Sequence, residues 1–123
     1  MLRRVAQNGA SPTRPALMKL VAVCTTVGQA DDARRIATAA VEQGLAACVH
    51  IDAIESVYRW QGRVQHETEQ RLMLKTTEAA APALRELVRQ MHPYELPALY
   101  SFEVAEAHPD YATWVMEQTQ PPA

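Results

Sequence analysis

Two cysteines are the residues best suited to bind a soft metal ion. Cys24 lies in a short apolar run, and Cys48 lies among small residues. A thiolate is a soft metal ligand, so Cys24 is a candidate site residue. The alternative is that each cysteine is a small, buried hydrophobic side chain, and for Cys48 packing is the favoured interpretation.

The segment 92–97 is the densest polar cluster of the chain, with the sequence His-Pro-Tyr-Glu-Leu-Pro. It brings together an imidazole, a phenol and a carboxylate, and two prolines restrict its backbone. A loop with little conformational freedom to lose suits a preorganised site. The alternative is a helix stop in which His92 caps the last carbonyl groups. The residues alone leave both interpretations open.

Four further polar residues are weaker candidates. Lys75 ends an apolar strand, where an ammonium group needs a carboxylate partner or an open cleft, and Glu95 is a candidate partner. His50 could join a metal shell or face solvent. His66 is interpreted as a surface residue, and His108 as a helix N-cap.

Composition and missing motifs exclude several classes of protein. The sequence has no Gly-rich phosphate loop, nucleophile elbow or zinc-protease helix, so we expect neither an enzyme nor an organic cofactor. The formal charge of −2 argues against a nucleic-acid partner, which requires a basic patch. No apolar run is long enough to span a membrane. Two cysteines within apolar segments favour reduced thiols and a cytoplasmic location over a disulfide.

The elements that must position these residues follow from apolar periodicity and breaker residues. The predicted order is strand, helix, strand, strand, helix, strand and a last helix. This is the β-α-β-β-α-β pattern of an α+β, ferredoxin-like fold with an extra C-terminal helix. The strands are predicted at 17–26, 46–60, 63–76 and 98–105, and the helices from Asp31 to a stop at Gly44, from about 79–82 to 91, and from Pro109 onward.

The 123 residues suit a single domain. We assign residues 17–118 to it and residues 119–123 to a flexible C-terminal tail. Residues 1–16 hold three arginines and no acid, which is typical of a transit peptide, but they lack an amphipathic stripe. A disordered N-terminal tail is therefore predicted for 1–16.

The long second strand changes its apolar phase. Val49 and Ile51 alternate on one face, whereas Ile54, Tyr58 and Trp60 lie on the other. Because a strand has a period of two, the change predicts an inserted residue, that is, a bulge near Asp52–Ala53. A two-residue hairpin turn at Gln61–Gly62 joins this strand to the next. The polar outer half of the hairpin is expected to project beyond the core.

The chain resembles the CutA-type divalent-cation tolerance proteins over roughly residues 17–118. Tyr-x-Trp-x-Gly followed by Lys-Thr and then by His-Pro-Tyr-x-x-Pro is a specific combination. The segments that carry the resemblance are Val23-Cys24-Thr25-Thr26, Leu45-Ala46-Ala47-Cys48-Val49, Ser56-Val57-Tyr58-Arg59-Trp60-Gln61-Gly62, Leu74-Lys75-Thr76-Thr77, His92-Pro93-Tyr94-Glu95-Leu96-Pro97 and Tyr111-Ala112-Thr113-Trp114.

The resemblance implies a homotrimer associated with tolerance to copper and other divalent cations. It implies copper binding at Cys24 and His92. Met91 stands where some members have a second histidine, and its thioether suits Cu(I) better than Zn(II) or Cu(II). Glu95 is a further candidate ligand. His50 stands where the family often has an asparagine.

Two other functions compete with metal handling. The trimers of this family resemble PII signalling proteins, which favours a ligand-sensing or scaffolding module. Acylphosphatases share the fold class, but they need an arginine in the loop after the first strand, and residues 24–29 contain none. Aromatic and charged residues beyond a small core predict clefts between subunits; the alternative is that they only stabilise the trimer. The predicted pocket residues are Tyr58, Trp60, Lys75, Tyr94, Glu95 and Trp114.

Overall fold

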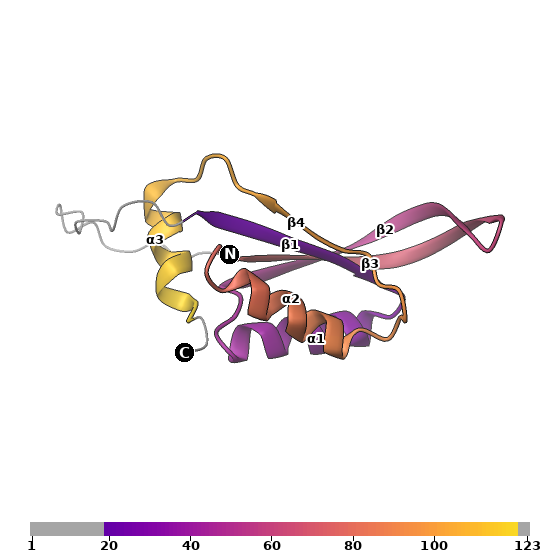
Figure 1. Cartoon of the computed structure of the whole chain (residues 1–123), viewed down its shortest axis with the longest axis horizontal. Helices are drawn as coiled ribbons and strands as arrows, with labels where there is room; N and C mark the ends of the chain where they lie inside the picture. The colour runs from indigo at the N-terminus through magenta and orange to yellow at the C-terminus, as the bar shows by residue number, and fades with distance from the viewer. Residues whose placement is uncertain (1–18, 121–123) are drawn as a thin grey trace.

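The computed structural model describes residues 19–120. Its elements follow the predicted order, so the α+β class is confirmed (Figure 1). The predicted tail at 1–16 and residues 121–123 lie outside the described residues. The elements are β1 (Leu20–Val27), α1 (Ala30–Glu42), β2 (Cys48–Trp60), β3 (Arg63–Thr77), α2 (Ala81–Met91), β4 (Leu99–Glu103) and α3 (Pro109–Gln118).

The four strands form one antiparallel sheet in the order β2-β3-β1-β4. Helices α1 and α2 cover one face of this sheet, and the hairpin of β2 and β3 extends well past them (Figure 1). The predicted projection of the hairpin is therefore confirmed. No helix within residues 19–120 is long and apolar enough to cross a membrane.

The core lies between the sheet and the two helices. Val21, Val23 and Val27 of β1 pack with Ile36 of α1 and Leu84 of α2. Because side chains alternate across a strand, Ala22, Cys24 and Thr26 face away from the helices. We call that side of the sheet the open face.

The bulge predicted near Asp52–Ala53 is wrong. The β2–β3 pairing is unbroken from Cys48↔Lys75 to Trp60↔Arg63. The apolar residues change phase because they serve different faces: Val49 packs against the core beneath the helices, whereas Tyr58 and Trp60 lie on the open-face side of the projecting hairpin. The apolar pattern of a strand shows which of its faces is packed against other residues. That face can change along the strand while the pairing with the neighbouring strand stays continuous.

Two turns have the predicted backbone. Gln61 and Gly62 have φ of 50° and 78°, as a type I′ hairpin turn requires. Gly44 follows α1 with φ of 69°, which is the left-handed conformation expected after a helix. The backbone N–H of Gln120 donates to the carbonyl of Gly44 at 2.7 Å, and Thr119 is buried. The flexible tail predicted for 119–123 is therefore wrong for residues 119 and 120, and residues 121–123 lie outside the described residues.

The open face carries exposed aromatic side chains. Tyr100 and Phe102 of β4 are 53% and 46% exposed. Helix α3 covers one end of this face, where Val115 packs on Leu20 and Ala47. The rest of the open face has no helix over it in the described chain (Figure 1).

Replacing Gly44 tests the backbone argument. A Cβ at this position would meet nothing closer than 3.8 Å, so the positive φ sets the cost. We expect Gly44→Ala to lower the free energy of unfolding by about 1–2 kcal/mol. Gly44→Asn should cost less, because asparagine tolerates the left-handed region. Urea unfolding at a fixed protein concentration measures both, and equal losses would contradict the argument.

Candidate functional site

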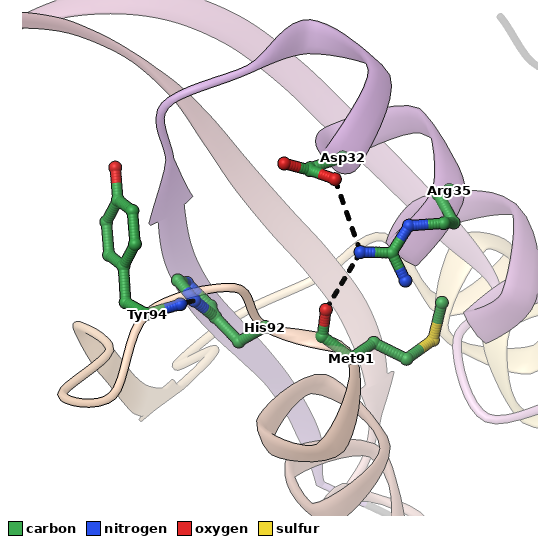
Figure 2. A network of polar contacts seen from close by, with 5 residues as sticks. All are labelled: Asp32, Arg35, Met91, His92 and Tyr94. Atoms are coloured by element: carbon green, nitrogen blue, oxygen red, sulfur yellow. Dashed lines mark hydrogen bonds and ion pairs between the residues drawn. The ribbon is translucent and has the colours of Figure 1, made fainter.

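His92 uses both ring nitrogens to hold the loop that follows α2. Its Nε2 lies 2.8 Å from the carbonyl oxygen of Thr26, and its Nδ1 lies 3.1 Å from the backbone nitrogen of Tyr94. A carbonyl oxygen only accepts, so Nε2 carries the proton and Nδ1 accepts from the Tyr94 N–H. These two hydrogen bonds fix the orientation of the ring and tie the loop to the end of β1. Figure 2 shows the ring beside Tyr94.

Tyr94 extends the same attachment to β3. Its hydroxyl donates to Oε2 of Glu69 at 3.3 Å, and Glu69 is buried. Burial, followed by the charge of Glu69 and the hydrogen bond to it, raises the pKa of the phenol. Gly28 faces this hydroxyl so closely that a Cβ there would lie 3.0 Å from it. The loop is therefore preorganised, as the two prolines predicted.

The sulfur of Met91 does not join His92. Arg35 donates to the Met91 carbonyl at 2.9 Å and to Asp32 at 3.3 Å, which ties the end of α2 to α1. The Met91 side chain points away from the imidazole (Figure 2). Glu95 is exposed. Of the predicted ligands in this region, only His92 remains near the loop backbone, and both of its ring nitrogens already make hydrogen bonds.

Cys24 faces the opposite side of the sheet from α2. It alternates with the helix-facing valines of β1 and is 1% exposed. Burial raises the pKa of the thiol, and the positive charges of Arg71 and Lys75 oppose this effect in part. Both Cys24 and Cys48 are free thiols. The sheet lies between the Cys24 side chain and the helix that His92 ends.

Lys75 meets an imidazole and not Glu95. Its Nζ lies 2.9 Å from Nδ1 of His50, which accepts the hydrogen bond. The neighbouring Cys48 contacts the hydroxyl of Tyr111 at 3.5 Å. Burial and this contact raise the pKa of Tyr111 to about 12. The sequence analysis missed these pairs, although counting back from the predicted turn places Lys75 beside the strand that carries His50 and Cys48.

The six predicted pocket residues are spread along a single chain. Tyr58 donates to Glu67 at 2.8 Å near the hairpin tip, which raises the pKa of the phenol to about 12. The hairpin tip and α3 lie at opposite ends of the molecule (Figure 1). A shared pocket thus requires neighbouring subunits and stays a prediction. Tyr58 and Trp60 lie near the tip, Tyr94 and Glu95 in the loop before β4, and Lys75 and Trp114 toward α3.

None of the six residues lines either of two hollows in the described chain, although one hollow includes Glu67, the partner of Tyr58. The other, of about 280 Å³, lies between the start of α2 and β4, where Arg85 donates to Ser101. Within residues 19–120, no three His, Cys, Asp or Glu side chains are grouped so as to hold a metal ion. Any metal site must therefore use fewer such ligands, another ligand type, or residues of a second chain.

The chain matches known proteins closely over most of its length. The family model described as CutA1 divalent ion tolerance protein matches residues 21–118. The divalent-cation tolerance protein CutA of Thermus thermophilus is 44% identical over 98 residues, covering 79% of this chain and 95% of that protein. The mouse protein CutA is 42% identical over 89 residues, covering 72% of this chain and 50% of the mouse protein, so the chain spans about half of that relative.

Solved structures give the same result. The structure of the divalent cation tolerance protein from Thermus thermophilus superposes with a TM-score of 0.78 at 42% identity, covering 82% of this chain and 99% of that chain. This level of identity supports the family as well as the fold. The resemblance found in the sequence motifs is confirmed.

Removing the His92 ring should loosen the loop. His92→Ala leaves the Tyr94 N–H and the Thr26 carbonyl without their partner, which should cost about 1–3 kcal/mol of unfolding free energy. Amide exchange of Tyr94 should become faster. The control is His66→Ala, on the exposed hairpin, which should change stability by less than about 0.5 kcal/mol. If the two variants lose the same stability, His92 does not hold the loop.

Proposed function

Because the chain belongs to the CutA1 divalent ion tolerance protein family, we propose that it binds a metal ion, copper in particular, and contributes to tolerance of such ions. The observation that carries the proposal is the Cys24 thiol. It forms no disulfide and faces the open side of the sheet; burial raises its pKa, and the nearby positive charges of Arg71 and Lys75 oppose this effect only in part. Soft thiolates bind copper and zinc strongly.

His92 is a second ligand only if the loop opens. Either ring nitrogen could bind a metal after giving up one hydrogen bond, at a cost of about 1 kcal/mol. The proposal therefore places the first metal bond at Cys24. A role for His92, Met91 or Glu95 depends on movement of the segment 91–97.

The proposed assembly is a homotrimer of ferredoxin-like subunits. The strand order β2-β3-β1-β4 and the two helices on one face support the ferredoxin-like arrangement. Tyr100 and Phe102 on β4, with Trp60 at the hairpin tip, are large apolar side chains that a small monomer leaves exposed. Aromatic side chains are enriched in subunit interfaces. Clefts between subunits would bring the predicted pocket residues together, and a ligand-sensing role would use the same clefts.

The proposed role is binding and not catalysis. The name of the Thermus thermophilus relative describes a divalent-cation tolerance protein. Two free thiols suit a reducing compartment, so we propose the cytoplasm as the location.

Light scattering after gel filtration tests the assembly. We expect a mass of about three times 13.7 kDa at micromolar concentration. Trp60→Asp should promote dissociation, because it places a charge in the proposed interface. Val41→Asp is the control: Val41 lies on α1 and is 44% exposed, close to the 47% of Trp60. A monomeric wild-type protein, or equal effects of the two variants, would contradict the proposal.

Titration with Cu(I) under reducing conditions tests the thiol. We expect one tightly bound ion per chain, lost in Cys24→Ser and kept in Cys48→Ser. The raised pKa of Cys24 means that the thiol is protonated at neutral pH, so binding must release a proton. Affinity should therefore fall as the pH is lowered. Affinity independent of pH, or unchanged in Cys24→Ser, would place the metal elsewhere.

A further inference from the structure

Four side chains with distinct chemistry form one row across the open face. In the strand register, Tyr100 pairs with Cys24, Cys24 with Met73, and Met73 with His50. Paired residues of antiparallel strands project to the same side, so all four point away from α1 and α2. The row therefore holds a thiol, a thioether and an imidazole in consecutive strands.

The spacing of the two sulfurs suits one ion. Directly paired residues have Cβ atoms about 4.5–5.5 Å apart. Metal–sulfur bonds are about 2.3 Å long, so two sulfurs that share an ion lie at most about 4.6 Å apart, when the ion is on the line between them. Met73 is half-buried, and its unbranched side chain can reorient without moving the backbone. No hydrogen bond to the Cys24 thiol exists within residues 19–120, so no existing bond must be broken.

We propose that Cys24 Sγ and Met73 Sδ form a binding site for a soft monovalent ion, Cu(I) or Ag(I). The imidazole of His50, next to Met73 in the row, is a third candidate ligand. This site rests on the proposed metal-binding function and names ligands for it. It replaces His92 as the partner of Cys24, because His92 ends a helix on the other side of the sheet and both of its nitrogens are bonded.

The surrounding charges favour a monovalent ion. Lys75 donates to His50 beside the row, and Arg71 lies on the other side in a bidentate pair with Asp52, at 2.8 and 3.2 Å. A thiolate with Cu(I) is neutral overall, whereas a thiolate with a divalent ion keeps one positive charge next to the Lys75 ammonium. Thioether and thiolate ligands select Cu(I) on softness as well. Zn(II) should bind this pair poorly.

Substitution of Met73 tests the proposal in the full-length protein. Met73→Leu conserves volume while removing the sulfur. Affinity is measured by competition with a Cu(I) chelator and by titration with Ag(I), which needs no reductant. We expect Met73→Leu to weaken both ions by at least about tenfold, since even residues behind the ligands typically contribute 10–100-fold. Zn(II) affinity should not change. Met91→Leu is the matched control and should bind like the wild type.

Two further measurements separate the possible outcomes. X-ray absorption of the wild-type Cu(I) complex should show two sulfur ligands, and this readout remains if Met73→Leu fails to fold. His50→Asn should cause a smaller loss of affinity than Met73→Leu. Copper bound by the wild type with one sulfur, unchanged in Met73→Leu and lost in His92→Ala, overturns this site but leaves the proposed function intact. A wild-type protein that binds neither Cu(I) nor Ag(I) overturns both.

Discussion

The antiparallel pairing of β1 with β3 determines what each face of the sheet can do. It sets Val23 opposite Leu74 on the helix side and Cys24 opposite Met73 on the open side. Shifting the pairing by one residue would move every side chain of β1 to the wrong face, so burial of the valines fixes the register. The position of the thiol is therefore a consequence of core packing.

The two faces of the sheet have different degrees of cover. Helices α1 and α2 close one face over aliphatic side chains, and their ends are tied by Arg35. Beyond the end that α3 covers, the open face keeps sulfur, imidazole, cationic and aromatic groups in ordered rows, because no helix of the described chain packs on it. A bound metal ion and a neighbouring subunit would therefore use the same surface. A subunit packed there would alter access to Cys24 as well as bury Tyr100.

Local signals in the sequence were sufficient for the elements but not for their spatial relations. The positive φ of Gly44 and the turn at Gln61–Gly62 follow from residue type alone. The false bulge arose because apolar phase was taken to report register, when it reports which face is covered. The neighbourhood of Cys24 depends on a register between strands almost fifty residues apart. That register could be derived for β2 and β3 from the turn, but for β1 it is set by tertiary packing.

The His92-Pro93-Tyr94 segment shows how a specific motif can have a structural explanation. The imidazole satisfies a strand carbonyl and a loop N–H, the tyrosine reaches a buried carboxylate, and Gly28 leaves room for the hydroxyl. Each group in that chain needs the others, since loss of one leaves a polar atom without its partner. This mutual dependence accounts for the motif without a metal. The Cys24 thiol is buried but makes no hydrogen bond within residues 19–120, which makes it the stronger indication of ligand chemistry.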